Sequence, residues 1–453
     1  MTVFCKPVFL GILLAQGLGV YAQEKDTASV WSIQQCFNYA AEHNIQVNTL
    51  RLGALSSEQD VIAAQGARIP SLYATAGNTF NNANNRSAVT GNRANQLTST
   101  GSYALNASVT LWNGHYIDNN IQQQELLNQS ATLSVQQALN NITLSITQDY
   151  LVALLAKENE RYITDLVHAT EASVKQGQML YEAGSIARKD LLQLQAQLAS
   201  DRYLLVQNEN SIRQSLLTLR QLLQLPSATA FDIVIPDSVQ VTGDLPVLET
   251  VQQAALTNFP EIKIGQLGVD VAALSIAKSR AGFKPVLTAN GNMGTGYSSV
   301  MTNTFTGPGY AENGFLTQTG NNFYQNLGLT LAVPIFSQRI NKTNLEKAKI
   351  GYKLADFNFQ NNRLVLSQAV EQAYLSALNS RSAYEAAQQQ LAAAGESYRI
   401  ANEQMKLGAI NTYDLLQQRN QYVQAVQAFT QAKYSAVLQR KVYEFYMGIP
   451  VTL

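Results

Sequence analysis

The chain has 453 residues, of which 14% are charged, and its 31 lysines and arginines balance its 31 aspartates and glutamates. This balance leaves no basic face, so nucleic acid is excluded as an expected partner. Hydrophobic residues reach 46%, yet the mean hydropathy is −0.10 because uncharged polar residues are abundant. That mix suits surfaces that face a water-filled interior.

The first residues have the pattern of a secretory signal. Lys6 is followed by an apolar run over 8–20, and Val20-Tyr21-Ala22 forms a cleavage site, so residues 1–22 are predicted to be removed. Cys5 would leave with this segment, and Cys36 would have no partner for an internal disulfide. No later segment has eighteen consecutive apolar residues. A membrane location would therefore require a β-barrel.

After a short disordered lead over 23–30, apolar residues recur at helical spacing from Trp31 to about Gly66. A break near His43-Asn44 predicts a short helix followed by a longer one, and Pro70 stops the second helix. The segment recurs at an offset of 215, where Leu52-Gly53 matches Leu267-Gly268. The sequence therefore contains a repeat.

Between Pro70 and Trp112 the period changes from 3.6 to 2, which predicts strands over 71–80 and 103–112, with a loop over 81–102. The second copy predicts strands over 286–297 and 323–335, with a loop over 298–322. About ten alternating residues span a bilayer at barrel tilt. A soluble β-hairpin with one buried face is the alternative. The positions predicted to face lipid are Tyr103, Leu105, Val109, Leu111, Leu327, Leu329, Leu331 and Val333.

A longer repeat covers the helical part. Residues 111–226 fall on 335–450 without a gap when the chain is shifted by 224 positions. Ungapped register over such a length is typical of duplicated helices, because one extra residue rotates every later side chain by about 100°. Helical hairpins are therefore predicted over about 115–225 and 338–446.

These two offsets divide the mature chain into a first repeat over 23–226, a linker over 227–246 and a second repeat over 247–453. The linker is expected to carry short extra structure beside the helices. Four strands cannot close a barrel, and an open sheet in lipid would leave two edges unpaired, so the chain must oligomerise. Two copies would give eight strands and a filled interior. Three copies would give twelve strands and a wet lumen, which the small polar positions favour.

No catalytic constellation is present in the sequence. His43, His115 and His168 lie far apart, without metal-ligand spacing, and no CxxC motif or phosphate-binding glycine loop follows a strand. We therefore expect no catalytic residue, cofactor or metal.

The two helical hairpins carry related turn motifs, Ala183-Gly184-Ser185-Ile186-Ala187-Arg188-Lys189-Asp190-Leu191-Leu192 and Leu407-Gly408-Ala409-Ile410-Asn411-Thr412-Tyr413-Asp414-Leu415-Leu416. Together with the whole-chain repeat, they resemble the TolC family of outer-membrane efflux proteins over residues 31–453. The resemblance implies a mainly α protein whose long hairpins form a periplasmic α-barrel. Four strands per chain would contribute to a trimeric 12-stranded barrel in the outer membrane.

The same resemblance implies a function. The chain would be the passive exit duct of a tripartite efflux pump or type I secretion system, working with a periplasmic adaptor and an inner-membrane transporter of the RND, ABC or MFS type. Drugs, metal ions, siderophores and polypeptides remain open as cargo. A periplasmic coiled-coil adaptor or scaffold without a barrel is the alternative, and a secreted enzyme has no candidate residues.

Function is expected to concentrate at the hairpin tips. Glycine permits the chain reversal, and adaptor docking is expected at the turn residues Gly184, Ser185, Gly408 and Ala409. Each tip aspartate either caps its helix or, in a trimer, contributes to a charged ring at the constriction. The predicted gate residues are Asp414, Gln417, Asp190 and Gln193. Gln417 stands where the fullest form of the family pattern has a second aspartate, and Arg188, Lys189 and Tyr413 are candidate polar links.

Overall fold

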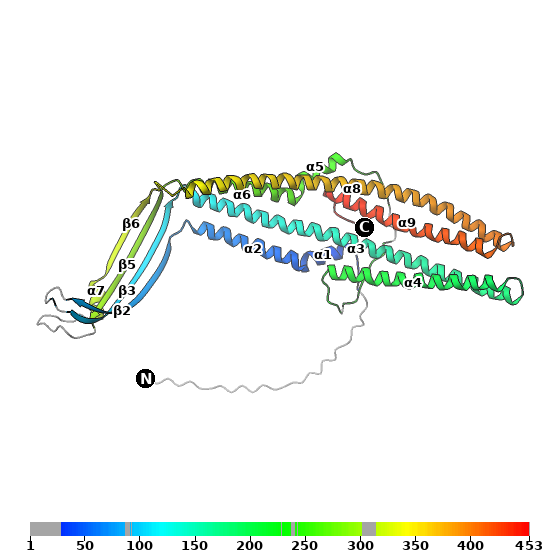
Figure 1. Cartoon of the computed structure of the whole chain (residues 1–453), viewed down its shortest axis with the longest axis horizontal. Coiled ribbons are helices and arrows are strands. Elements are labelled where there is room, and N and C mark those ends of the chain that lie inside the picture. The colour runs from blue at the N-terminus through cyan, green and yellow to red at the C-terminus, as the bar shows by residue number, and fades with distance from the viewer. Residues whose placement is uncertain are drawn as a thin grey trace, which may run out of the picture.

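The computed structural model of the protein describes residues 29–86, 91, 93–227, 229–236, 241, 243–300 and 314–452. The predicted signal peptide, residues 1–22, lies outside the described residues. The protomer is elongated (Figure 1): a β-sheet lies at one end, the turns of two helical hairpins lie at the opposite end, and shorter elements lie along the middle.

The helices repeat with constant offsets. At an offset of 215, α1 (Ile33–His43) and α2 (Ile45–Gly66) correspond to α5 (Leu248–Asn258) and α6 (Pro260–Ala281). At an offset of 224, α3 (Tyr116–Glu182) and α4 (Arg188–Leu222) correspond to α8 (Ile340–Lys406) and α9 (Thr412–Tyr446). The duplication of the helical hairpins predicted from the sequence is confirmed.

Local capping explains the predicted break between the first two helices. Ser32 begins α1 with a capping box, because its Oγ accepts from Gln35 N at 3.3 Å and Gln35 Oε1 accepts from Ser32 N at 2.8 Å. Asn44 ends that helix and begins α2, where its Oδ1 accepts from Val47 N at 3.1 Å. In the second repeat Pro260 opens α6, where its missing N–H costs nothing.

The larger sheet is antiparallel and joins the two repeats. Its strands are β2 (Ser71–Arg86), β3 (Arg93–Trp112), β5 (Val286–Val300) and β6 (Tyr324–Ala332), in the order β2-β3-β5-β6. The central β3–β5 pair links the repeats, and within the described residues β2 and β6 each pair on one side only. These two strands are therefore the open edges of the protomer sheet.

The predicted loop over 81–102 is wrong for residues 81–86 and 93–102, because β2 continues to Arg86 and β3 begins at Arg93, while residues 87–90 and 92 lie outside the described residues. Asn, Ser and Thr occupy both faces there, so period-2 hydrophobicity vanishes while the backbone ladder continues. The predicted loop over 298–322 is also partly wrong, since β5 reaches Val300 and α7 (Phe315–Asn321) follows. Residues 301–313 of that loop lie outside the described residues.

Two strand ends also differ from the prediction. β6 stops at Ala332, so Val333 lies beyond it, because Pro334 lacks the N–H that a ladder needs. In β3 the pairing with β5 shifts between Thr110 and Trp112, which leaves Leu111 without a partner in the register. This irregularity breaks the alternation by one residue.

The register places the other predicted apolar positions on one face of the sheet. Leu105 pairs with Met293, while Leu329 and Val109 both pair with Ala289. Since cross-strand partners point to the same side, β3, β5 and β6 contribute to one apolar face. That face includes Leu72, Ala74, Tyr103, Leu105, Val109, Leu287, Ala289, Met293, Leu327, Leu329 and Leu331.

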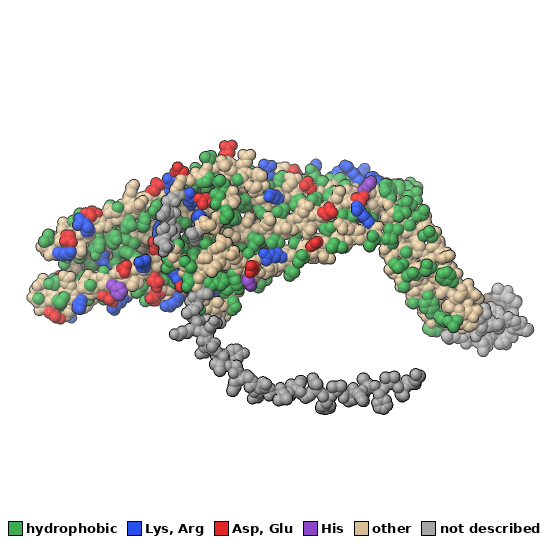
Figure 2. Space-filling model, turned by 180° about the vertical axis from the view of Figure 1, so that it is seen from behind, with side chains coloured by type: hydrophobic (Ala, Val, Ile, Leu, Met, Phe, Trp, Pro, Cys, Tyr) green, Lys and Arg blue, Asp and Glu red, His purple; other side chains and the backbone are tan. Residues whose placement is uncertain are grey.

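The opposite face is polar, and the strands carry no charge apart from Arg86 at the end of β2 and Arg93 at the start of β3. Asn106, Ser108, Thr110, Thr288 and Thr330 alternate with the apolar positions. Residues 69–85, 94–114, 285–300 and 314–338 contain no Lys, Arg, Asp or Glu. Figure 2 shows the visible side of the sheet as hydrophobic and neutral polar, whereas charged side chains lie on the helices.

A glycine on β3 makes room for an aromatic ring. A Cβ built on Gly101 would overlap the Tyr297 ring, which packs edge-on against Phe315 of α7 at 4.9 Å. We expect Gly101→Ala to lower the free energy of unfolding by about 1–3 kcal/mol through overpacking. Thermal melting of the purified protein should show this, with Gly77→Ala as a control, because the nearest atom there is an ordinary 3.6 Å away. Equal melting of both variants would contradict it.

Two hydrophobic cores fill the middle of the protomer. One contains Tyr150 and Leu154 of α3 with Tyr434 and Val437 of α9. The other packs Val370 of α8 against Tyr443 of α9. The C-terminal part of α9 therefore belongs to both cores.

A small parallel sheet joins the start of the described chain to the linker. β1 (Ser29–Trp31) pairs with β4 (Phe231–Ile233), and Tyr150 Oη donates to Trp31 O at 3.1 Å and Val234 O at 2.9 Å. The disordered lead predicted over 23–30 is therefore wrong for residues 29 and 30. The short extra structure expected in the linker is present as β4.

Candidate functional site at the helical tips

Both hairpin tips end in the same glycine turn. Gly184 and Gly408 each have φ +72°, a conformation that L residues rarely adopt. Ser185 N donates to Leu180 O at 2.8 Å, and Ala409 N donates to Gln404 O at 2.9 Å, so both turns close with a six-to-one hydrogen bond. The sequence motif therefore fixes two equivalent chain reversals.

The tip aspartates take part in helix capping. Asp190 Oδ2 accepts from Ala187 N at 3.3 Å at the start of α4. Asp414 Oδ2 accepts from Asn411 Nδ2 at 2.9 Å, while Asp414 N donates to Asn411 Oδ1 at 2.9 Å at the start of α9. The carboxylates also lie where the helix dipole favours negative charge. Capping occupies one oxygen of each carboxylate.

A polar groove lies between the two hairpins near the tips and has a volume of about 510 Å³. The structure brings two predicted gate residues together here, because Gln193 of α4 and Gln417 of α9 both line it. Tyr413 lines it as well. The remaining lining residues are Ala196, Gln197, Leu416, Asn420, Gln421 and Gln424.

The groove offers unused hydrogen-bonding capacity. Gln193 Oε1 is buried and accepts no hydrogen bond within the described residues. A buried amide oxygen without a donor costs free energy, so it favours contact with an added donor. Arg188 and Lys189, two of the candidate polar links, are exposed and form no ion pair in the described part of one chain.

Further from the tips, a buried polar network ties the two hairpins together. Arg419 of α9 forms an ion pair with Asp201 of α4, and both side chains are almost fully buried. Arg419 Nη2 donates to Thr170 Oγ1 of α3 at 2.6 Å, and Thr170 Oγ1 donates to Asp201 Oδ2 at 2.7 Å. Gln197 Nε2 donates to Asp201 Oδ1 at 2.9 Å. Three helices thus meet in one charge-assisted network.

A second ion pair supports α9 on α3 closer to the cores. Lys433 Nζ lies 3.0 Å from Glu158 Oε1 and 3.3 Å from Oε2. Between the two ion pairs, the Tyr162 hydroxyl is buried and has no hydrogen-bond partner among the described residues. Burial, aided by the neighbouring Tyr422, raises the pKa of Tyr162 above its ordinary value, so this phenol stays neutral.

Sequence reasoning missed this network, although the repeat contains a signal for it. Asp201 corresponds to Ala425 at the offset of 224, and Arg419 corresponds to Gln195. Asp201 and Ala425 are both fully buried, so the same packing position holds a carboxylate in one repeat and a methyl group in the other. A charged residue in one repeat that corresponds to an uncharged residue in the other, at a position buried in both, is the sequence signal for such a network.

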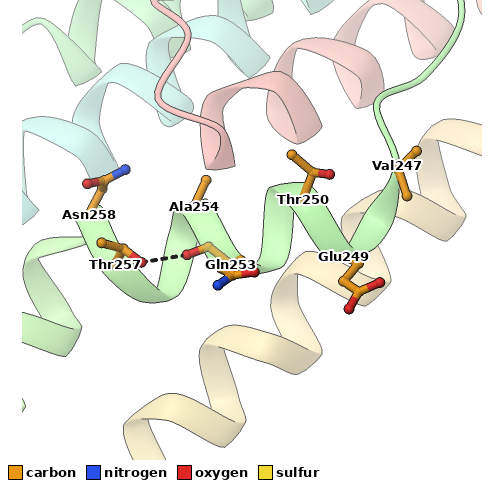
Figure 3. A pocket seen from close by; sticks show the side chains of 7 residues that line it. All are labelled: Val247, Glu249, Thr250, Gln253, Ala254, Thr257 and Asn258. Carbon is orange, nitrogen blue, oxygen red and sulfur yellow. Dashed lines mark hydrogen bonds between the residues drawn. The ribbon is translucent and has the colours of Figure 1, made fainter.

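A further depression, of about 500 Å³, lies on α5 (Figure 3). All its lining residues belong to that helix or precede it: Val247, Glu249, Thr250, Gln253, Ala254, Thr257 and Asn258. Thr257 Oγ1 donates to Gln253 O on the same helix at 2.8 Å. Because one helix supplies the whole lining, polar groups do not converge on a ligand there.

Among the described residues, no cluster of three or more His, Cys, Asp or Glu side chains is placed to hold a metal ion. None of the helices in the described part of the chain combines the length and apolarity needed to cross a membrane.

Comparison with known protein families finds one match, which lies within the second repeat. Residues 251–441 match the model of the family described as outer membrane efflux protein. No curated protein sequence matches the chain.

The fold matches solved outer-membrane channels. CusC has a TM-score of 0.76 at 16% identity, covering 92% of this chain and 91% of that one. VceC of Vibrio cholerae has a TM-score of 0.75 at 15% identity, and the match covers 92% of this chain and 96% of VceC. The CmeC channel of Campylobacter jejuni has a TM-score of 0.73 at 18% identity, and the match covers 97% of this chain and 94% of CmeC. At these identities the likeness establishes the fold.

The chain has the TolC-like outer-membrane channel fold, and residues 251–441 within its second repeat match the outer membrane efflux protein family. The matched family and the similar solved structures are outer-membrane efflux channels, so the comparisons do not favour the adaptor alternative. The matched family is one of transport proteins.

Proposed function

We propose that three copies of this chain form the exit duct of a tripartite pump or type I secretion system, closed at the helical tips until a periplasmic adaptor docks. An inner-membrane transporter supplies the energy, and the duct is passive. This proposal rests mainly on one observation: each open edge strand of the sheet lies on the same flank of the protomer as a helix with an exposed apolar stripe.

The two flanks of the protomer are complementary in position. On the β2 flank, α2 exposes an apolar stripe that includes Leu52, Leu55 and Ile62, each more than half exposed. On the β6 flank, α8 exposes Ile350 and Leu354 to a similar degree. Large exposed apolar stripes mark interfaces. Pairing β6 of one copy with β2 of the next would cover both stripes and close the sheet.

The apolar sheet face supports lipid contact. Leu327, Leu329 and Leu331 are 85%, 70% and 63% exposed in the protomer, while the opposite face is neutral and polar. A closed sheet with this polarity has an apolar exterior and a wet lumen. Tyr103 is an exception in part, because its ring packs against Phe315 at 6.3 Å.

Adaptor docking is proposed at the tips, on the turn residues Gly184, Ser185, Gly408 and Ala409 and along the groove that contains Gln193 and Gln417. The unpaired Gln193 carbonyl and the exposed Arg188 and Lys189 supply polar contacts. We propose that the channel also opens and closes at these helical tips. A channel of similar fold, MtrE of Neisseria gonorrhoeae, has been solved in an open state (TM-score 0.72, 18% identity), which supports an opening step for this chain.

The proposed constriction is a ring of three Asp414 carboxylates, with Gln417 beside it and Asp190 on the hairpin of α3 and α4. We expect Asp414→Asn to weaken block by a trivalent cation added at the periplasmic side by tenfold or more, because clustered carboxylates attract multivalent cations. Planar-bilayer recording of single channels measures the block. Asparagine keeps an oxygen for the Asn411 amide, so the variant removes charge while retaining the cap.

Asn411→Ala is the matched control, because it removes the cap and leaves the carboxylate. It should lower helix stability by about 1 kcal/mol and leave cation block unchanged. If Asp414→Asn and Asn411→Ala change block equally, the aspartate acts through capping and the ring assignment is wrong. Failure of the wild-type chain to form any conducting channel would contradict the duct itself.

A further inference from the structure

Basic side chains gather where the second repeat meets the sheet. Over residues 278–284 and 339–349, at the end of α6 and the start of α8, the sequence has seven basic residues and one carboxylate, Glu346. Figure 2 shows Lys and Arg side chains at the bend between helices and sheet. We call this set the junction patch: Lys278, Arg280, Lys284, Arg339, Lys342, Lys347 and Lys349.

The first repeat lacks such a patch at the equivalent positions. Residues 63–69 and 115–125 contain one lysine or arginine, Arg68, with the carboxylates Asp118 and Glu125. Arg68 Nη2 lies 2.6 Å from Asp118 Oδ1, so its charge is compensated. Since both repeats build the same helices, the fold itself does not require the positive charge of the second repeat.

Most of the charge in the junction patch is uncompensated. Glu346 pairs with Lys349 at 2.8 Å, and the other six residues form no ion pair within the described residues. Lys278 Nζ donates to Asn120 Oδ1 and Gln123 Oε1, both at 2.7 Å, and lies 5.1 Å from the centre of the Tyr116 ring. Neutral oxygens and an aromatic face hold this ammonium group in place without cancelling its charge.

The backbone adds a second observation. Gln338 and Arg339 have φ 50° and 67°, the left-handed region that L side chains rarely adopt. Their first-repeat counterparts are Gly114 and His115, with φ 68° and 70°. Gln338 is therefore strained in the second repeat, whereas Gly114 adopts the same conformation without strain in the first. The second repeat also has an arginine, Arg339, directly between the sheet and α8. Backbone strain of this kind clusters at functional positions.

The patch also has a defined depth. Charged residues are absent from 285–300 and 314–338, and Lys284 and Arg339 are the first charges beyond the strands. With the sheet in the bilayer, which rests on the proposed function, these residues lie at the periplasmic headgroup level. Anionic headgroups attract basic clusters beside membrane segments, with a gain of roughly fivefold in affinity per Lys or Arg.

We propose that the junction patch binds the phosphate groups of anionic phospholipids in the periplasmic leaflet of the membrane. Lys278, held by Asn120 and Gln123, is the fixed part of the site, and the exposed Arg280, Lys284, Arg339 and Lys342 close around the phosphate. The first repeat has no such site among its described residues. Each protomer therefore carries one lipid-selective face out of two.

The test uses the full chain purified in a neutral detergent. Phosphatidylglycerol or phosphatidylethanolamine with the same acyl chains is added at equal molar ratio, and native mass spectrometry counts the lipids retained. We expect at least tenfold preference for phosphatidylglycerol. Arg339→Gln/Lys342→Gln should reduce this preference about tenfold or more, and Arg280→Gln/Lys284→Gln should do so independently. Millimolar inorganic phosphate should not displace the lipid, whereas displacement would make free phosphate the ligand and overturn the proposal.

The matched control is Arg161→Gln/Lys175→Gln, which removes an exposed arginine and lysine of α3 far from the sheet and should leave the preference unchanged. Equal retention of both lipids by the wild-type chain, or an unchanged preference in both junction variants, overturns the proposal. Flotation with neutral phosphatidylcholine vesicles distinguishes failure of the lipid site from failure of the membrane placement. A chain that floats without lipid preference overturns this inference alone, and a chain that does not float overturns the membrane placement as well.

Discussion

Leu329→Arg is expected to abolish insertion of the protein into the outer membrane, whereas Thr330→Arg is expected to be tolerated. The two residues are neighbours on β6, but Leu329 pairs with Ala289 on the apolar face and Thr330 pairs with Thr288 on the polar face. An arginine at mid-membrane depth on a lipid-facing position costs about 2–4 kcal/mol, and a trimer would incur this cost three times.

Membrane fractionation followed by heat-modifiability of the oligomer on gels measures the outcome. The amount of Leu329→Arg in the membrane fraction should fall by tenfold or more, and Thr330→Arg should remain inserted with altered ion selectivity. Thr330→Arg is the control for Leu329→Arg, because it introduces the same residue into the same strand and so has matched effects on expression and strand propensity. Equal loss in both variants would contradict the assignment of faces, and loss with Thr330→Arg alone would reverse it.

Asp201→Asn is expected both to destabilise the protein and to open its tips. Removing the carboxylate leaves Arg419 as an uncompensated buried charge, which costs about 3–5 kcal/mol. Because Arg419 is on α9 while Asp201 and Thr170 are on α4 and α3, the lost contacts are those that hold the two hairpins together. Thermal melting measures the first effect, and single-channel leak in a planar bilayer measures the second.

Glu171→Gln is the control for this experiment. Glu171 pairs with Arg202 at 2.7 Å between α3 and α4, but both side chains are substantially exposed and solvent screens the pair, so thermal melting should change little, with no added leak. The double variant Asp201→Ala/Arg419→Gln restores the residues of the other repeat. It should recover stability in part while the leak persists. Wild-type leak in Asp201→Asn would show that the network stabilises the fold without gating.

The helical part of the fold is predictable from sequence because helices resist insertion. The offset of 224 carries α3 and α4 onto α8 and α9 with identical lengths, as Tyr116–Glu182 and Ile340–Lys406 show. Glycine at 184 and 408 marks the turns because a positive φ leaves few alternatives. These signals are local, so a single sequence contains them.

The sheet and the site are less predictable, for physical reasons. Residues 81–86 and 93–102 form strands whose side chains are polar on both faces, so hydrophobic alternation does not reveal them. The irregularity at Leu111 depends on the partner strand β5, which belongs to the other repeat and reaches this point at Leu287. The Arg419 network depends on three helices meeting, and its members have no shared local pattern.

The placement of α9 has a mechanical consequence. Tyr434, Val437 and Tyr443 anchor its C-terminal part in both cores, while Asp414 lies about 20 residues away, or about 30 Å along the helix. α9 can therefore tilt as a rigid rod about the point near Tyr434 where it enters the core. A tilt of about 10° there would carry the Asp414 end sideways by about 5 Å, so loss of the contacts that hold Arg419 would let a small rotation beside the cores displace the tip by that distance.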